Sequence, residues 1–119
     1  MNTRVYITEC PRDAMQGITT FIPTEKKIQY LNHLLTLGFD RLDFGSFVSE
    51  KAIPQLKDTR EVLSELHESE TKLLAIVANE RGAEDALNFD RIDFIGYPFS
   101  INNTFQLRNT GKSIEESLG

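Results

Sequence analysis

Hydrophobic positions along the chain follow two patterns, short β-branched runs and longer stretches with helical spacing. Strand-like runs and helical stretches take turns in the order 4–9, 23–38, 39–47, 58–69, 72–78, 81–89, 91–100 and 113–118. Strands that alternate with amphipathic helices are typical of a parallel sheet with helices packed outside it. The pattern therefore predicts an α/β fold built from repeated strand–helix units.

The helical stretches place their apolar residues on one side. In the stretch 23–38, Thr24 is expected to cap the helix and Gly38 to follow its end. The run 72–78 is the most hydrophobic of the chain and is expected to be buried on both faces. The residues expected to face the core from the helices are Ile28, Leu31, Leu34, Leu35, Val62, Leu63 and Leu66.

The first strand leads directly into a charged pair. Its apolar run, RVYIT, is followed by Pro11, and then by Arg12, Asp13 and Gln16. Parallel α/β folds place their chemistry at the carboxyl ends of the strands. The pair is therefore expected on the functional face, although adjacent charges at a turn are more often no more than a solvated surface.

Length, charge and cysteine content narrow the classes of protein. The 119 residues suit one domain, and the net charge of −5 comes without a basic block, so nucleic-acid binding is not expected. No run approaches the roughly 18 apolar residues of a membrane-spanning helix, and no apolar signal-peptide segment opens the chain. The lone cysteine, Cys10, fits a cytoplasmic location and is expected to be a packed thiol.

Three blocks of sequence resemble one enzyme family, the hydroxymethylglutaryl-CoA lyases. ECPRDAMQG at 9–17 resembles their GPRDGLQ signature, and residues 22–58 resemble the following helix and strand, where they carry SFVSPK and then VPQ. FSINNTFQLRNTGKSIEES at 99–117 resembles their segment FSKRNINCSIEES. The resemblance implies about the first four strands of a TIM barrel, with residues 1–119 as the N-terminal half of the lyase domain.

The family's reaction gives the charged pair a role. Its members use a divalent metal to cleave 3-hydroxy-3-methylglutaryl-CoA into acetyl-CoA and acetoacetate by a retro-Claisen step. Such a cleavage leaves an enolate, which a cation and an arginine stabilise. The resemblance thus implies an acyl-CoA substrate and Mg²⁺ or Mn²⁺, with Asp13 as a metal ligand. Arg12 would steady the enolate or thioester oxygen, and Gln16 would contact the metal or the substrate.

Further candidate residues follow from the same resemblance. The family carries a catalytic glutamate at the end of the second strand, where this chain has Asp43, a carboxylate one methylene shorter. Ser46 and Phe47 match positions that line the substrate region, and Ser100 and Asn109 match polar positions facing the site. A strand-end aspartate and a core phenylalanine remain the structural alternatives for Asp43 and Phe47.

The resemblance also implies that this chain lacks part of the site. The family completes its metal site with a His-x-His pair on a late strand and a later asparagine, none of which occurs within residues 1–119. The chain alone is therefore expected to be inactive. Two alternatives stay open: a condensing acyl-CoA synthase or aldolase on the same barrel, and a non-catalytic half-barrel that forms a homo-oligomer to bury its open strand edges.

Overall fold

The structure is a computed structural model that describes residues 4–49 and 51–98. The expected helix at 113–118 and the candidate residues Ser100 and Asn109 lie outside the described residues. All neighbouring strands pair in parallel, in the order β1-β2-β3-β4 in which they occur along the chain. The parallel α/β architecture expected from the sequence is thereby confirmed. Within the described residues, no helix is both long enough and apolar enough to cross a membrane.

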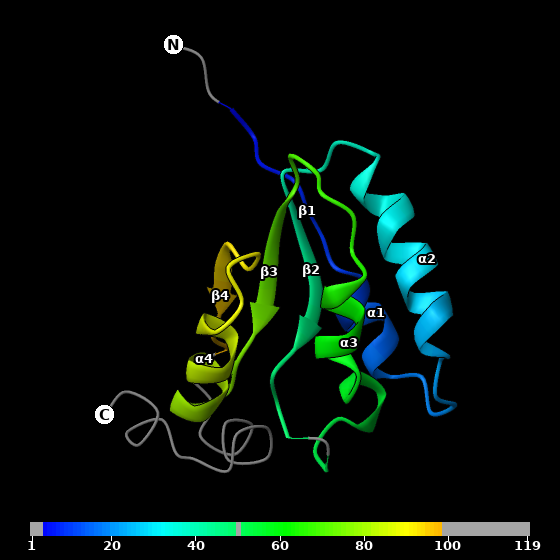
Figure 1. Cartoon of the computed structure of the whole chain (residues 1–119), viewed down its shortest axis with the longest axis vertical. Helices are drawn as coiled ribbons and strands as arrows, with labels where there is room; N and C mark the ends of the chain where they lie inside the picture. The colour runs from blue at the N-terminus through cyan, green and yellow to red at the C-terminus, as the bar shows by residue number, and fades with distance from the viewer. Residues whose placement is uncertain (1–3, 50, 99–119) are drawn as a thin grey trace.

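The helices and strands are shorter than the patterns that predict them. In chain order they are β1 (Thr8–Glu9), α1 (Pro11–Gln16), α2 (Thr24–Leu35), β2 (Arg41–Ser46), the 3-10 helix η1 (Pro54–Leu56), α3 (Thr59–Ser64), β3 (Lys72–Ile76), α4 (Glu80–Leu87) and β4 (Phe94–Gly96). Figure 1 shows β2 and β3 side by side with their carboxyl ends at the same edge, and α2 and α3 together on one side of them. Helices α1 and η1 were not predicted from the pattern.

The hydrophobic core lies between one face of the sheet and helices α2 and α3. Its buried residues are Leu31, Leu34, Leu35, Leu42, Phe44, Val62, Leu63, Leu66, Leu73 and Ala75, with Ile28 packed against them. The apolar stripes predicted for both helices are therefore confirmed. Along β3, however, burial alternates: Leu73 and Ala75 are buried, whereas Leu74 and Ile76 are only half-buried. The described helices cover one face of this strand more fully than the other.

Aspartate side chains set where two of the strands begin. Asp40 donates its backbone N–H to Ile7 O over 3.1 Å and accepts from Ile7 N at Oδ2 over 2.8 Å. Asp93 forms the same pair of bonds with Leu73, both of 2.9 Å. Each carboxylate replaces a carbonyl in the ladder, so regular pairing begins only after it. Strands β2 and β4 consequently start two and three residues later than their patterns predict.

Helix α2 differs from its prediction at its first residue. Its N-cap is Pro23, and Thr24 is the first helical residue, so the expected Thr24 cap is wrong. The Thr24 hydroxyl instead donates to Asp58 Oδ2 over 2.7 Å. After the helix, Gly38 has a φ of +79°, the left-handed conformation for which glycine was expected there.

Helix α3 stops at Ser64, earlier than its apolar pattern suggests, because distant side chains bind the backbone of the following turn. Asn32 donates to Glu65 O over 3.2 Å and accepts from His67 N over 2.7 Å. Arg91 donates to the carbonyl oxygens of Leu63, Leu66 and His67. These partners satisfy carbonyl groups that a longer helix would have bonded internally.

A buried ion pair joins segments far apart in the sequence. Lys27 Nζ lies 2.7 Å from Asp58 Oδ1, and the two side chains are 2% and 6% exposed. Lys27 also donates to the backbone oxygen of Gln55. The Gln55 amide in turn binds the loop that follows α1, donating to Ile18 O and Thr20 O and accepting from Ile22 N. Both buried charges, on Lys27 and Asp58, thus have hydrogen-bond partners, without which their burial would be strongly unfavourable.

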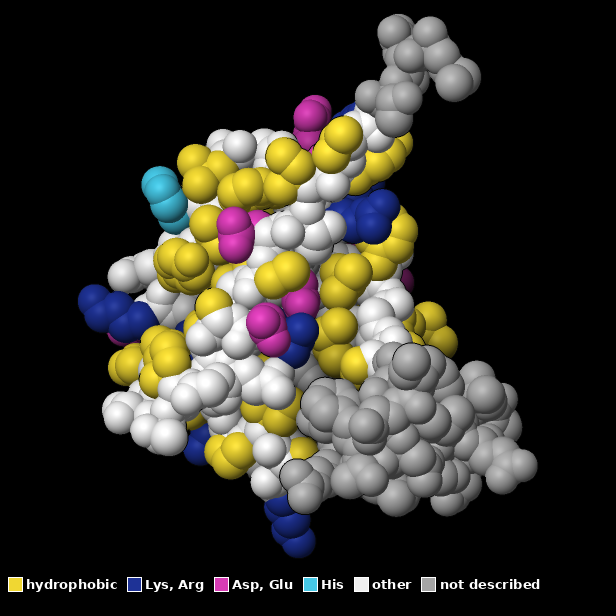
Figure 2. Space-filling view, turned by 180° about the vertical axis from the view of Figure 1, so that it is seen from behind, with side chains coloured by type: hydrophobic (Ala, Val, Ile, Leu, Met, Phe, Trp, Pro, Cys, Tyr) yellow, Lys and Arg dark blue, Asp and Glu magenta, His cyan; other side chains and the backbone are white. Residues whose placement is uncertain are grey.

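Side chains from three neighbouring segments meet on one face of the sheet. Arg41 Cζ on β2 lies 5.6 Å from the ring centroid of Tyr6, just before β1, and 4.8 Å from that of Phe94 on β4. Figure 2 shows the molecule from behind, with hydrophobic side chains exposed across the surface and acidic and basic groups together near its centre.

Replacement of Lys27 tests the buried ion pair. Lys27→Met leaves the Asp58 carboxylate buried without its cation, and we expect a loss of about 3–5 kcal/mol in the free energy of unfolding. Urea unfolding of the variant and the wild type measures it. Lys26→Met, at the exposed neighbouring position, is the control and should change stability by no more than about 0.5 kcal/mol. Equal effects of the two variants would contradict the role given to the pair.

Candidate functional site

Arg12, Asp43 and Gln16 meet just beyond the carboxyl end of β1, where Asp43 is the third of the six residues of the neighbouring strand β2. Arg12 Nε donates to both carboxylate oxygens of Asp43 over 3.0 Å. Arg12 Nη1 donates to Gln16 Oε1 over 2.6 Å. The side chains of Arg12 and Asp43 are 15% and 5% exposed. The structure thus brings together three residues that were selected from the sequence, and it holds the guanidinium at two of its nitrogens.

Local backbone structure explains how these side chains meet. Pro11 begins α1 immediately after β1, a position for which its fixed φ and missing N–H are suited. One helical turn then places Arg12 and Gln16, four residues apart, on the same side. On β2, the pairing register with β3 shifts between Asp43 and Gly45. Such a bulge at a strand end re-aims side chains.

Gly45 makes room for helix α3 beside this bulge. A Cβ atom at this position would lie 2.7 Å from Thr59 Cγ2, closer than carbon atoms approach without a shift of one of them. The Thr59 hydroxyl meanwhile accepts from Ser46 N over 3.2 Å. The close approach of α3 therefore holds the last residues of β2, which follow Asp43.

Burial determines the electrostatics of Asp43. Desolvation raises the pKa of its carboxyl above the usual range, and the charge and hydrogen bonds of Arg12 oppose that rise without cancelling it. Asp13 adds a smaller rise, since a second negative charge lies nearby. The aspartate is thus neither the solvent-facing residue of the structural alternative nor a carboxylate fully stabilised by its partner.

Cys10 differs from its prediction. It was expected to be packed, but its thiol is exposed beside the end of β1, where its Sγ lies 3.8 Å from Thr8 O. Desolvation and the nearby Asp43 carboxylate raise the pKa of this thiol. Since the thiolate is the nucleophilic form, Cys10 is not activated for nucleophilic chemistry.

Asp13 offers a carboxylate for a metal ion, but within the described residues it stands without further ligands. The side chain is exposed and close enough to Asp43 to raise the pKa of that carboxyl. Residues 4–49 and 51–98 contain no group of three or more His, Cys, Asp or Glu side chains able to hold a metal ion. The carboxylate oxygens of Asp13 are suitable ligands for Mg²⁺, but a single carboxylate does not form a metal-binding site.

Ser46 and Phe47 line a different cavity, between the starts of α3 and α4. This cavity measures about 360 Å³ and is also bordered by Lys57, Arg60 and Asn79. The Ser46 hydroxyl accepts from Val48 N over 3.2 Å. The Phe47 ring packs against Phe89 with 5.7 Å between centroids. The structure therefore supports the packing alternative for Phe47 and does not bring these two residues to Arg12.

Another cavity adjoins the Arg12 cluster at Gln16. It measures about 380 Å³ and is lined by Gln16, Gly17, Ile18, Thr19, Ala52, Ile53, Pro54 and Gln55. Gln55, which the sequence analysis did not select, holds one wall of this cavity through its bonds to the 18–22 loop. Nothing in the sequence marks a glutamine for this role.

The burial of Lys27 could have been predicted from the sequence, since Lys27 lies one helical turn before Leu31 on the inward side of α2.

Parallel strands that alternate with helices, with a charged cluster after the first strand, are the arrangement found in β/α-barrel proteins. No family model matches the chain, but individual proteins do. It is 30% identical to a cytoplasmic 3-hydroxy-3-methylglutaryl-CoA lyase of Rattus norvegicus over 92% of this chain and 32% of the relative. It is 36% identical to hydroxymethylglutaryl-CoA lyase YngG of Bacillus subtilis over 91% of this chain and 36% of the relative.

Solved structures agree with these relatives. An HMG-CoA lyase from Acinetobacter baumannii, in complex with coenzyme A and 3-methylmalate, superposes with a TM-score of 0.89 at 34% identity, over 95% of this chain and 37% of that one. The Bacillus subtilis HMG-CoA lyase superposes with a TM-score of 0.88 at 36% identity, over 97% and 39%. Over more than nine tenths of its length, the chain is therefore similar to part of the TIM barrel of HMG-CoA lyases. It spans about a third of the length of the curated relatives it matches.

The opposite pKa shifts of two aspartates give a test by pH. The pKa of Asp43 is higher in the folded protein than in the unfolded chain, where it is about 3.9. The shift therefore stabilises the folded protein fully below about pH 3.9, and this stabilisation is lost as pH rises through the pKa of the folded state. For Asp40, the hydrogen bond from Ile7 N, followed by the bond and charge of Arg4, lowers the pKa. Its contribution is therefore present above about pH 3.9 and is lost as pH falls through the lower folded value.

Asp43→Asn and Asp40→Asn separate the two effects. Between about pH 3 and about pH 7, the unfolding free energy of the wild type relative to Asp43→Asn should fall as pH rises. Relative to Asp40→Asn it should increase with pH. Urea unfolding over this range measures both, with each variant serving as the control for the other. Parallel pH profiles for the two variants would contradict the assignment.

Proposed function

We propose that the protein is a carbon–carbon lyase that cleaves a 3-hydroxy-3-methylglutaryl-CoA-type thioester into acetyl-CoA and acetoacetate. The observation that carries the proposal is the Arg12 guanidinium, anchored on buried Asp43 at the carboxyl edge of the sheet. Relatives and structural neighbours named as HMG-CoA lyases support it. The coenzyme A in the Acinetobacter baumannii structure supports an acyl-CoA substrate.

The geometry suits Arg12 to a developing negative charge. In the retro-Claisen step the C3 hydroxyl proton is removed, C3 becomes a carbonyl, and the electron pair of the C2–C3 bond passes to the thioester as an enolate. Arg12 Nε is bound to Asp43 and Nη1 to Gln16, so Nη2 remains available, among the described residues, to donate to that oxygen. A fixed donor that needs no reorganisation stabilises such a charge most effectively.

Asp43 acts in this proposal as the anchor of Arg12. Both of its oxygens accept from Arg12 Nε, and burial keeps water from competing for them. Its shorter side chain, relative to the family's glutamate, is consistent with this close contact. The same carboxyl has a raised pKa, which brings it nearer the range useful for proton transfer.

We further propose that Asp13 contributes one ligand to a divalent ion, Mg²⁺ or Mn²⁺. When bound, such an ion supplies additional positive charge to a substrate oxygen. The described residues contain no group of three or more His, Cys, Asp or Glu side chains able to hold a metal ion, so in this proposal the remaining ligands come from elsewhere. Residues 1–119 then form the N-terminal half of the lyase domain.

The location and assembly of the protein belong to the same proposal. A cytoplasmic location is supported by the rat relative, which is named as cytoplasmic, while a relative from Arabidopsis thaliana is named as mitochondrial. A homo-oligomer would cover the exposed hydrophobic side chains Val5 and Ile7 next to edge strand β1. No role in binding nucleic acid or a membrane is proposed.

Replacement of Arg12 by lysine tests the proposed role of Arg12 in stabilising the enolate. Lysine keeps a charge but cannot bind Asp43 and Gln16 while donating to substrate. We expect kcat for cleavage to fall by about 10²–10³-fold, measured in the intact protein as acetyl-CoA release. Arg4→Lys makes the same exchange at the opposite end of the strands, where the side chain is 70% exposed, and should leave the rate unchanged. Comparable rates for Arg12→Lys and the wild type would contradict the proposal.

The direction of the reaction needs its own assay. The condensing alternative predicts product formation from acetyl-CoA and an oxo-acid, and the lyase proposal predicts cleavage of 3-hydroxy-3-methylglutaryl-CoA as the faster reaction. If the protein catalysed only the condensing reaction, and Arg12→Lys lost that activity, Arg12 would keep its proposed role, but the protein would be a condensing synthase and not a lyase.

Asp13→Asn tests the metal ligand. Replacing an anionic ligand by a neutral amide weakens binding of a hard cation. We expect the Mg²⁺ concentration for half-maximal activity to rise at least about tenfold. Glu25→Gln, an exposed carboxylate exchange at the start of α2, is the control. The same Mg²⁺ requirement in Asp13→Asn and the wild type would exclude Asp13 as a ligand.

A further inference from the structure

The backbone of the segment that follows α1, residues 18–22, is bonded to a single side chain. Gln55 Nε2 donates to Ile18 O over 2.8 Å and to Thr20 O over 2.9 Å. Gln55 Oε1 accepts from Ile22 N over 2.8 Å. Among residues 4–49 and 51–98, the only other hydrogen bond that joins this segment to its surroundings runs back to α1. The conformation of the segment therefore depends on one amide group.

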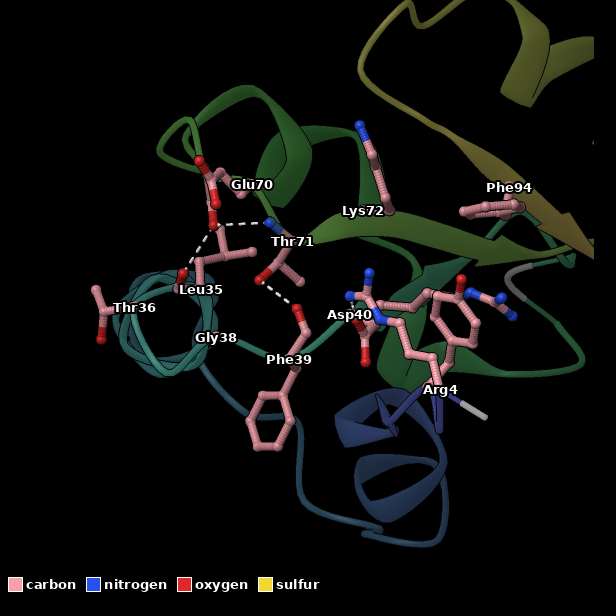
Figure 3. Close-up of a pocket in the computed structure, with 13 residues that line it drawn as sticks. Arg4, Leu35, Thr36, Gly38, Phe39, Asp40, Glu70, Thr71, Lys72 and Phe94 are labelled. Atoms are coloured by element: carbon pink, nitrogen blue, oxygen red, sulfur yellow. Dashed lines mark hydrogen bonds and ion pairs between the residues drawn. The ribbon is translucent and has the colours of Figure 1, made fainter. Parts of the chain in front are cut away.

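Segments at the opposite end of the sheet, before β2 and β3, are held by more than one side chain. Figure 3 shows Thr71 donating to Phe39 O, a bond of 2.7 Å. Ser69 donates to Leu35 O over 2.8 Å. These bonds come from different residues, so the loss of one leaves the other in place. Within the described part of the chain, no second side chain bonds the backbone of residues 18–22 in this way.

The bonds of Gln55 also fix the end of α1, the helix that carries Arg12 and Gln16. Ile18 N donates to Met15 O over 3.0 Å, while Ile18 O accepts from Gln55. Ile18 thus joins the last turn of α1 to Gln55. Gln16 lies within this joined stretch, and its Oε1 accepts from Arg12 Nη1 over 2.6 Å. Gln55 is therefore connected to the guanidinium through the backbone of residues 16–18 and one hydrogen bond at each end.

Gln55 can hold this segment because its own position is fixed. It lies in η1, which is in contact with α1, and it is only 5% exposed. Its backbone oxygen accepts from the buried ammonium of Lys27. Lys27 and Lys57 also contact the ring of Phe21, with Nζ 4.2 Å and 4.7 Å from its centroid, but these contacts do not bond the backbone. A glutamine amide offers two N–H donors and one acceptor, which match the two carbonyl groups and the one N–H group of the segment.

We propose that Gln55 is a positioning residue for the proposed lyase reaction. Through residues 16–18 it holds the Arg12 guanidinium in the orientation that donates to the enolate oxygen, and it does not touch the substrate itself. This inference rests on the role proposed for Arg12. Because the enolate charge develops only in the transition state, a displaced Arg12 lowers kcat and leaves KM nearly unchanged. Displacement by about 1 Å can lower the rate by about 10²-fold.

Gln55→Met removes all three bonds to the segment, since methionine has a similar length but no amide. We expect kcat for cleavage by the intact protein to fall by about 10–10²-fold, with KM within about twofold of the wild-type value. Gln55→Glu keeps the acceptor but loses both donors and should lower kcat in the same way. Gln29→Met, at an exposed position of α2, is the matched control and should change neither constant. Thermal unfolding identifies a variant that does not fold, and the other Gln55 variant then decides the test.

A double variant tests the path through Gln16. Gln16→Met removes the bond to Arg12 Nη1, so the further change Gln55→Met should then lower kcat little more, as expected for two residues that act on one contact. Losses that multiply in the double variant would show that Gln55 acts by another route and would overturn the inference.

Rotation of the Arg12 guanidinium provides a measurement that does not need catalysis. Bonds at Nε and Nη1 should slow rotation about the Nε–Cζ bond, which nitrogen NMR of the intact protein measures. We expect rotation at least about tenfold faster in Gln55→Met, the effect of losing one ordinary hydrogen bond, and unchanged in Gln29→Met.

The two measurements separate this inference from the proposed function. If the wild type does not cleave the thioester but Gln55→Met frees the guanidinium, the proposed reaction fails and Gln55 remains the residue that positions Arg12. Unchanged rotation of Arg12 in Gln55→Met would overturn the inference whatever the activity. A raised KM with unchanged kcat would also overturn it, because Gln55 would then act on substrate binding and not through Arg12.

Discussion

The buried pair of Lys27 and Asp58 is the contact on which the arrangement of the site depends. Two opposite charges are removed from water together, which is tolerated only when every donor and acceptor is satisfied. Here the partners come from α2, from the residues just before α3, and from the backbone of η1. Gln55 extends the network to the loop after α1. The loop that follows the helix carrying Arg12 is thereby held in place.

Strand β2 carries an acidic and a basic side chain that are held in different ways. Asp43, in the middle of the strand, is buried and bound by Arg12. Arg41, the first residue of the strand, lies close to the rings of Tyr6 and Phe94. The carboxylate is thus held by hydrogen bonds from a guanidinium, whereas the guanidinium of Arg41 is held by contacts with aromatic rings.

Sequence patterns predicted the parallel α/β architecture and the inward faces of α2 and α3 correctly, because burial of an apolar stripe follows from its spacing. They also placed Arg12 and Asp13 on the functional face, since strand ends meet at one edge of a parallel sheet, whereas Asp43 and the role of Gln16 came from the resemblance to the HMG-CoA lyases. Element ends were less predictable. Asp40, Asp93 and Arg91 determine them through bonds to residues twenty or more positions away, which no local pattern contains.

By itself, the sequence determined the order of strands and helices, the core leucines and the charged pair after the first strand. Only the tertiary structure decided that Asp43 is buried against Arg12, that Cys10 is exposed, and that Ser46 and Phe47 line another cavity. It alone placed Arg41 beside the rings of Tyr6 and Phe94. The reason is physical: periodicity fixes which side of an element is apolar, whereas pairing and desolvation arise between segments that meet only when the chain has folded.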